Sequence, residues 1–247
     1  MWASAVGLPD VYIAMGQTAE NVAQIEGVTR DQQDAFALRS QQNTGRALAA
    51  GFFENDITPI ALPDGTVLRH DDGPRPQTTL EGLRRLMPAF WPDGTVTAGN
   101  SCPLNDGAAA VVVMSDTRAD ALGIRPLARI VASAVTGIDP EIMGLGPVEA
   151  CRRALTRAGL TMDDMDLVEI NEAFAAQVLP TMRHLEIDPD RLNVHGGAIA
   201  LGHPFGMTGA RIMTTLIHGL AATGGRYGLE AMCVGGGQGM AMIIERL

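Results

Sequence analysis

Aromatic and charged residues are scarce in this chain of 247 residues. Phe, Trp and Tyr make up 4% of the sequence and Asp, Glu, Lys and Arg 19%, whereas hydrophobic residues make up 46%. A chain this apolar is not intrinsically disordered, and its length allows one large domain or two smaller ones with a sizeable core. The 29 glycines, with many alanines and valines, favour an α/β protein with close backbone packing.

Positive charge is also in short supply. The formal net charge is −10 at pH 7 and the sequence pI is about 4.9. This balance argues against nucleic acid or an anionic membrane as a principal partner. An anionic cofactor would need local donors such as arginine side chains or helix N-termini.

Cysteine, signal-peptide and membrane-span patterns are equally sparse. The three cysteines are an odd number without disulfide spacing, which indicates a reducing compartment. There is no signal-peptide pattern and no apolar run approaching 18 residues, so we expect a soluble cytoplasmic protein. Without CxxC or HExxH spacing we expect no metal site and no permanently bound cofactor.

Apolar periodicity and capping residues predict alternating strands and helices, which implies a mainly parallel sheet with helices on its faces. Thr29 with Gln32, and Thr78 with Glu81, are spaced as capping boxes. Two PDGT turns frame an irregular arm between 51 and 100, which is too long for an ordinary connection. The predicted helices are 18–26, 29–50, 79–86, 117–122, 147–158, 172–185 and 208–222, and the predicted strands are 107–114, 126–136, 167–170, 227–234 and 239–245.

A glycine-rich stretch (193–211, NVHGGAIALGHPFGMTGAR) places His203 just ahead of a long apolar helix. The bland interpretation is a histidine in a turn or at a helix cap. The repeated glycines favour a functional one, because they cost conformational entropy and let backbone approach a ligand. A helix starting near Gly206 would point its positive dipole end at the imidazole, which favours the neutral base.

Cys233 ends an apolar strand and precedes three glycines in CVGGGQG (233–239). It is either a small buried hydrophobe or an acid–base group with room for a ligand beside it. A free thiol, with its ordinary pKa of ~8.5, would serve near neutral pH with little tuning. The strands on either side of the glycines predict a hairpin.

Asn171 follows a short strand and opens NEAFA (171–175), at the strand end where α/β sheets place ligands. It either caps the next helix or orients a water or carbonyl, with Ala173 and Phe174 lining a narrow slot. Cys102 lines a pocket or is structural with equal weight, whereas Cys151 is interpreted as core or helix surface. The histidines are interpreted as surface or packing groups at 70, 184 and 218, and as a neighbour of the site at 195.

NEAFA, GGAIALGHPFGMTGAR and CVGGGQGMA together resemble the thiolase family, whose members make or break carbon–carbon bonds between acyl-CoA units. MGQTAENVA (15–23) and TAGNSCPLNDGAAA (97–110) are similar to two further family motifs. The resemblance implies a thiolase-like α/β fold with a complete C-terminal core domain, whose mixed, mainly parallel sheet has helices on both faces. We expect a CoA-facing loop domain at 1–104, the last strand and helix of the N-terminal core domain at 105–125, and the C-terminal core domain at 126–247.

The resemblance also implies roles for single residues. His203 matches the histidine that activates the nucleophile and helps form an oxyanion hole, and Cys233 the cysteine that shuttles a proton at the acyl α-carbon. Asn171 matches the asparagine whose bound water completes the first oxyanion hole. Gly235 matches the glycine whose N–H contributes to the second.

Further positions match the family's substrate contacts, with coenzyme A or acyl-CoA as substrate rather than resident cofactor. Arg75 matches a loop-domain arginine that meets the nucleotide end of CoA. Three positions depart from common family residues, at Ala14, Cys102 and His195, which bears on acyl-chain preference. The residues that match the acyl and pantetheine tunnel are Met15, Cys102, Ala173 and Phe174.

In the family the acyl-forming cysteine lies ahead of the MGQTAEN motif, and no cysteine of this chain matches it. We therefore expect a CoA-dependent acyltransferase of fatty acid or steroid degradation, in which this chain carries the proton-transfer groups but not the nucleophile. Alternatives are a catalytically incomplete CoA- or partner-binding subunit of a split thiolase, and a thiolase-like steroid side-chain aldolase. The family implies a homodimer or homotetramer, with a second polypeptide as a further possible partner.

Overall fold

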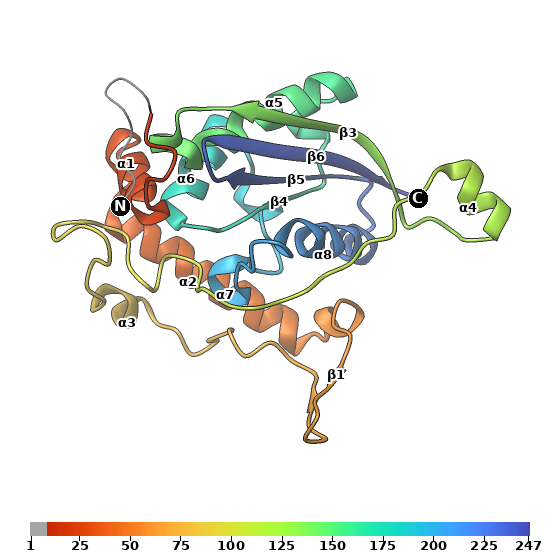
Figure 1. The fold of residues 1–247 in the computed structure, drawn as a ribbon, viewed down its shortest axis with the longest axis horizontal. Coiled ribbons are helices and arrows are strands. Elements are labelled where there is room, and N and C mark those ends of the chain that lie inside the picture. The colour runs from red at the N-terminus through yellow and green to blue at the C-terminus, as the bar shows by residue number, and fades with distance from the viewer. Residues whose placement is uncertain (1–8) are drawn as a thin grey trace.

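A four-stranded sheet forms the centre of the computed structural model, which describes residues 9–247 (Figure 1). Its strand order is β3 (Ala128–Gly137), β6 (Gln238–Arg246), β5 (Tyr227–Val234) and β4 (Leu167–Ile170). β4 and β5 are parallel, whereas β5 with β6 and β3 with β6 are antiparallel. The mixed sheet and the glycine-turn hairpin are confirmed, and the mainly parallel direction is wrong. A hairpin forces β5 and β6 to run antiparallel.

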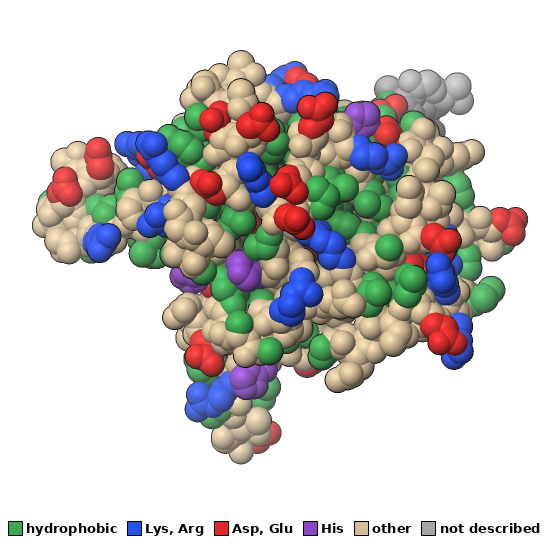
Figure 2. All heavy atoms as spheres, turned by 180° about the vertical axis from the view of Figure 1, so that it is seen from behind, with side chains coloured by type: hydrophobic (Ala, Val, Ile, Leu, Met, Phe, Trp, Pro, Cys, Tyr) green, Lys and Arg blue, Asp and Glu red, His purple; other side chains and the backbone are tan. Residues whose placement is uncertain are grey.

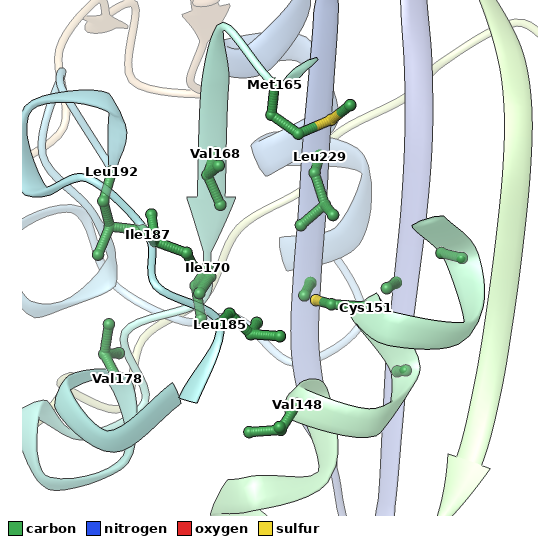
Figure 3. Packing of buried hydrophobic residues seen from close by; sticks show 14 of the residues in the cluster. Val148, Cys151, Met165, Val168, Ile170, Val178, Leu185, Ile187, Leu192 and Leu229 are labelled. Carbon is green, nitrogen blue, oxygen red and sulfur yellow. The ribbon is translucent and has the colours of Figure 1, made fainter. Parts of the chain in front are cut away.

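One face of the sheet is covered by α5 (Gly146–Ala158), with α6 (Ala175–His184) in the same apolar cluster. Figure 3 shows this packing, in which Val168, Ile170 and Leu229 meet helical side chains such as Val148 and Cys151. Cys151 is therefore a core residue, which is one of the two predicted alternatives. This face supplies the main apolar burial of the chain.

The opposite face is covered by α8 (Thr208–Thr223), so helices lie on both sides of the sheet (Figure 1). The short helix α7 (Ala198–Leu201) precedes α8 in the chain. A Cβ at Gly228 of β5 would lie 2.7 Å from a methyl carbon of Leu216 in α8. Glycine at this position therefore lets α8 approach the strand closely.

The N-terminal part packs against this core through α1 (Met15–Ile25) and α2 (Arg30–Ala49), which contact α6 and α7. The capping box of Thr29 with Gln32 is confirmed. The second capping box is wrong: Thr79 caps α3 (Leu80–Arg84) by accepting the N–H of Gly82, while the Thr78 hydroxyl donates to the Arg75 carbonyl. Around the first PDGT turn, β1 (Ile60–Ala61) and β2 (Val67–Leu68) form a small hairpin.

The predicted strand 107–114 does not form. This segment is extended and exposed, with Val112 at 85% and Val113 at 69% of full exposure, and it leads along the molecule to α4 (Asp116–Leu122) (Figure 1). An apolar run becomes a strand only where neighbouring strands take up its backbone groups. Within residues 9–247 no strand pairs with it.

Four 3-10 turns complete the element order within the described part of the chain: η1 (Phe52–Asn55), η2 (Pro140–Leu145), η3 (Met162–Asp164) and η4 (Pro189–Arg191). On the face seen in Figure 2, arginine side chains are interspersed with aspartate and glutamate side chains. The acidic side chains on that face are therefore not gathered in one patch. No helix of the described chain is both long and apolar enough to cross a membrane.

Candidate active site

The candidate site begins where the parallel strands β4 and β5 end. Asn171 follows β4 directly, and its backbone N–H donates to the carbonyl of Ala231 in β5 at 2.9 Å. Cys233 lies two residues further along β5. Because carboxyl ends of parallel strands lie at one edge of a sheet, the fold brings these two predicted residues to the same edge.

Cys233 is buried in a small apolar cluster at this edge. Met143 and Ala173 are its buried members, and Met15, Cys102 and Phe174 are among the partly buried side chains packed against it. The structure therefore gathers with Cys233 all four residues predicted to line the acyl and pantetheine tunnel, although they come from three separate parts of the sequence.

A short antiparallel contact carries Cys102 to this place. The Cys102 N–H donates to the Ala173 carbonyl at 3.0 Å, and the Ala175 N–H donates to the Asn100 carbonyl at 2.9 Å. These backbone bonds hold the segment from Asn100 against the start of α6, with Phe174 between them. This contact brings Cys102 into the cluster around Cys233, and its pocket-lining role stays a prediction.

Asn171 is fully buried, yet neither the oxygen nor the nitrogen of its side-chain amide has a hydrogen-bond partner within the described residues. The capping alternative is wrong, because α6 begins at Ala175 and its N-cap is Phe174. A buried amide without partners is costly unless something else satisfies it. The Asn171 amide is thus available to a water or a substrate carbonyl.

The glycine turn after β5 is open on one side and tight on the other. A Cβ at Gly235 would meet nothing within 4 Å, whereas a Cβ at Gly237, which has a positive φ of 88°, would collide with the Ile138 carbonyl. Open space beside Gly235 leaves room for a ligand, and Gly237 fits the chain against the loop after β3.

His203 lies in the loop between α7 and α8, half-buried. Its backbone N–H donates to Oδ1 of Asn105 at 3.0 Å, and its ring lies edge-on to Phe205. Burial, and next the positive charge of Arg211, lower the pKa of His203 below its ordinary value. The direction agrees with the predicted neutral imidazole. The causes, however, are burial and the charge of Arg211.

Thr208 is a site residue that the sequence did not reveal. Its Oγ1 lies 3.0 Å from the Pro204 carbonyl and 2.6 Å from Nδ1 of His203. A hydroxyl has one hydrogen, which donates to the carbonyl, so the oxygen accepts from Nδ1–H. Nε2 then keeps its lone pair and can take a proton. A threonine five residues after a histidine, at the start of a helix, is the only sequence signal for this role.

Both thiols at the site are held in the protonated form. Burial raises the pKa of Cys233 to about 12 and that of Cys102 to about 11. The expectation that the Cys233 thiol works near neutrality with little tuning is wrong, because its apolar surroundings disfavour the thiolate. Cys233 therefore rests as a proton donor.

Glu172 is a second residue that sequence reasoning missed. It is 1% exposed, and its carboxyl accepts from the Ser40 hydroxyl at 2.6 Å, from the Asn193 amide at 2.8 Å and from the Ile199 N–H at 3.2 Å. Burial raises the pKa of Glu172, against these hydrogen bonds, which lower it. Through these hydrogen bonds the Glu172 carboxyl, next to Asn171 in the chain, joins α2, the glycine-rich stretch and α7. A glutamate following a buried strand was the available signal.

Arg75 lines a cavity of about 350 Å³. Residues of α2, α3 and α7 line the same cavity, together with Ala98 and Gly99. The Arg75 N–H donates to the Gln41 side chain at 2.7 Å. The structure thus places Arg75 at a hollow whose wall includes residues shortly before Cys102 in the chain. Its predicted contact with CoA remains a prediction.

The remaining histidines lie elsewhere. His195 stacks on Phe52 with ring centroids 3.6 Å apart and lines a cavity of about 580 Å³ at the end of α2. His218 contacts Asp56, and His184 contacts Glu26. The packing interpretation of His184 and His218 agrees with these contacts.

The sequence matches two family models, "Thiolase, N-terminal domain" over residues 3–117 and "Thiolase, C-terminal domain" over residues 124–246. A curated relative, an acetyl-CoA acetyltransferase of Chromobacterium violaceum, is 50% identical over 246 residues, which cover 97% of this chain and 63% of the relative.

Solved structures agree with this similarity. An acetyl-CoA acetyltransferase of Bacillus anthracis superposes with a TM-score of 0.94 at 46% identity, covering 97% of this chain and 62% of its own. Human mitochondrial 3-ketoacyl-CoA thiolase in complex with CoA gives 0.91 at 44% identity, covering 100% of this chain and 66% of its own. The chain spans 62–66% of the length of these three relatives, and the predicted fold is confirmed.

Proposed function

Because this chain belongs to the thiolase family, we propose that it takes part in CoA-dependent acyl transfer, by thiolytic cleavage of a 3-ketoacyl-CoA or the reverse condensation. Its contribution is the proton-transfer side of the site. His203 takes the proton of the nucleophile through Nε2, Cys233 handles the proton at the acyl α-carbon, and Asn171 holds the water of an oxyanion hole. The Gly235 N–H contributes to the second oxyanion hole.

One observation carries this proposal: Cys233 and the unpartnered amide of Asn171 lie at one sheet edge, beside the apolar cluster that holds Met15, Cys102 and Phe174. A thioester with an apolar acyl chain needs such a lining, together with a few polar groups at the reacting carbon. The protonated resting thiol of Cys233 suits the cleavage direction, in which a carbanion leaves and requires a proton.

Coenzyme A is the proposed thiol substrate. One solved relative is a thiolase in complex with CoA. In this chain the cavity at Arg75 supplies a cationic donor that an anionic nucleotide needs on an acidic protein. Arg75 is therefore proposed to meet the nucleotide end, and the segment before Cys102 to guide the pantetheine arm.

The acyl-forming nucleophile is proposed to be none of the chain's three cysteines. Burial raises the pKa of Cys151 to about 12 within the α5 cluster, and the thiols at 102 and 233 are similarly disfavoured as thiolates. A nucleophilic cysteine needs a lowered pKa or an adjacent base.

Domain boundaries, assembly and location are proposed as expected from the sequence. The domains are a loop domain at 1–104, an N-terminal core remnant at 105–125 and a C-terminal core domain at 126–247. The proposed assembly is a homodimer or homotetramer, and the proposed location is the cytoplasm. A second polypeptide that supplies the nucleophile is an alternative partner.

The test measures CoA-dependent loss of a 3-ketoacyl-CoA by the purified chain, alone and mixed with a polypeptide corresponding to the part of the Bacillus anthracis relative that the chain does not cover. Turnover only in the mixture supports the proposal. Turnover by the chain alone would place the nucleophile within it. CoA binding without turnover, both by the chain alone and in the mixture, would favour the alternative of a catalytically incomplete CoA-binding subunit.

Matched variants identify the acting groups in whichever preparation is active. His203→Ala and Cys233→Ala are expected to lower kcat/KM at least about 100-fold, since each removes a proton-transfer group. His184→Ala and Cys151→Ala serve as controls away from the site. Release of a ketone or aldehyde in place of an acyl-CoA would favour the aldolase alternative, against which the presence of both His203 and Cys233 argues.

A further inference from the structure

Two buried glutamates lie side by side under α8. Glu169 of β4 and Glu230 of β5 are register partners, and they are 3% and 9% exposed. Their neighbours Val168, Ile170 and Leu229 face α5, so strand alternation turns both carboxyls to the α8 side. Two adjacent carboxyls in a buried layer repel each other and lose hydration, which is costly without compensation.

Arg211 supplies that compensation from the first turn of α8. Arg211 as a whole is half-buried, but its Nη1 and Nη2 atoms are buried and have no hydrogen-bond partner among residues 9–247. The same is true of Oε2 of Glu169 and Oε2 of Glu230. Burial raises the pKa of each glutamate to about 8, and the Arg211 charge acts against that rise in both. Arg211 thus acts electrostatically on both strands.

Further acidic groups also act on this guanidinium through their charge. Burial lowers the pKa of Arg211, and four carboxyls raise it. They come from β4, from the segment after β4, from the end of η1 and from the arm: Glu169, Glu172, Asp56 and Asp71. Carboxyls outnumber the cation, so some stay protonated at neutral pH, in line with the raised pKa values of Glu169 and Glu230.

Arg211, Glu169 and Glu230 each lie within three residues, along the chain, of a residue that belongs to or supports the proposed site. Asn171 comes two residues after Glu169, and Cys233 three residues after Glu230. Arg211 lies three residues after Thr208, which holds the His203 ring. Movement of α8 relative to the two strands would therefore change the separation of the proposed catalytic groups.

We propose that Arg211, Glu169 and Glu230 form a positioning unit that fixes α8, and with it the His203 loop, over the carboxyl ends of β4 and β5. Its catalytic consequence rests on the proposed function. Its structural and electrostatic consequences are independent of that function, because they can be measured on the chain without a substrate.

The first test is NMR titration of the His203 ring in the chain, assigned with His203→Asn. Because the Arg211 charge disfavours the imidazolium, Arg211→Met is expected to raise the pKa of His203, and Arg211→Lys, which keeps the charge, to leave it low. Arg153→Met, on an exposed pair of α5, is the matched control. An unchanged His203 titration in a folded Arg211→Met variant would overturn the electrostatic part.

The second test is a double-mutant cycle, which also covers a failure of Arg211→Met to fold. Glu169→Gln and Glu230→Gln are each expected to lower the midpoint of thermal unfolding by a few degrees at most. The double variant is expected to lose clearly more than the sum, because neither strand then has a carboxyl on which the charge of Arg211 can act. Additive losses would overturn the unit, and Glu149→Gln is the exposed control.

The third test is turnover, in whichever preparation is active. Arg211→Met is expected to lower kcat about 100-fold with KM little changed, because small misplacements of catalytic groups act on the chemical step. Arg211→Lys is expected to recover part of that loss. Unchanged kcat in Arg211→Met would overturn the positioning role. If the unsubstituted protein shows no turnover at all, the proposed function fails, and the NMR and double-mutant results still decide the unit.

Discussion

The two faces of the central sheet differ in chemistry although the same strands build both. The α5 face buries aliphatic side chains such as Ile170, Leu229 and Ile243. The α8 face combines apolar contacts, such as Leu167 with Leu216, with the buried glutamates and Arg211. Because successive residues of a strand point to opposite sides, one four-residue strand, β4, can serve both faces.

This difference indicates a division of labour. The α5 face stabilises the sheet through apolar burial, and it contains no group of the proposed chemistry except Cys233 at its outer end. The α8 face carries buried charge, which costs stability and is retained where it orients functional groups. The α8 side instead carries His203 in the loop before α8, together with Thr208 and Arg211, which act on its ring.

The largest expected effect on stability comes from placing a charged residue on the apolar α5 face, compared with placing an apolar residue on the polar α8 face. Leu229→Glu places a carboxyl in the apolar cluster without a cation and is expected to cost more than about 4 kcal/mol of unfolding free energy. Glu230→Leu, one residue further on, removes a carboxyl from the polar face and is expected to cost far less. Urea denaturation of both variants measures the contrast, and equal losses would contradict it.

The pH dependence of stability sharpens the comparison next. Burial raises the pKa of Glu169 and of Glu230 from 4.5 to about 8, so the folded chain holds their protons more tightly than the unfolded chain. Their contribution to stability is complete below about pH 4.5 and is lost as pH rises to about 8. Unfolding midpoints measured across this window should fall with pH, less steeply in Glu230→Gln. An identical slope in Glu230→Gln would exclude this glutamate as a source.

Thiol reactivity gives a smaller, graded effect. Cys102 is partly exposed with a pKa of about 11, whereas Cys233 and Cys151 are buried with pKa values of about 12. Alkylation followed by peptide mass spectrometry should therefore label Cys102 first, roughly tenfold faster than the others, and none rapidly. Denatured chain, in which all three react alike, is the control. Preferential labelling of Cys233 would show that its thiol is activated.

The smallest effect is expected at the exposed ion pair of Glu149 and Arg153 on α5, whose nitrogen–oxygen distance is 2.8 Å. Arg153→Met should change the unfolding free energy by less than about 0.5 kcal/mol, because solvent screens such a pair. A larger loss would mean that surface charge on the apolar side of the sheet matters as well.

Local sequence was a good guide to the C-terminal half. The hairpin of β5 and β6, strand β4 and helix α8 all lie within two residues of their predicted bounds. It failed where a neighbour decides the outcome. The run 107–114 has strand composition without a partner strand, and Thr78 has capping spacing while Thr79 makes the cap.

The sequence by itself determined the family, the helices and strands of the core, and the residue types of the site, because glycine turns, apolar periodicity and motif spacing are local properties. The tertiary structure alone decided which residues lie together and how strongly they are charged. It showed Cys102 beside Ala173, Thr208 on the ring of His203, and two buried glutamates on which the charge of Arg211 acts. The physical reason is that burial and facing charges set proton affinities, and both arise only when distant segments pack together.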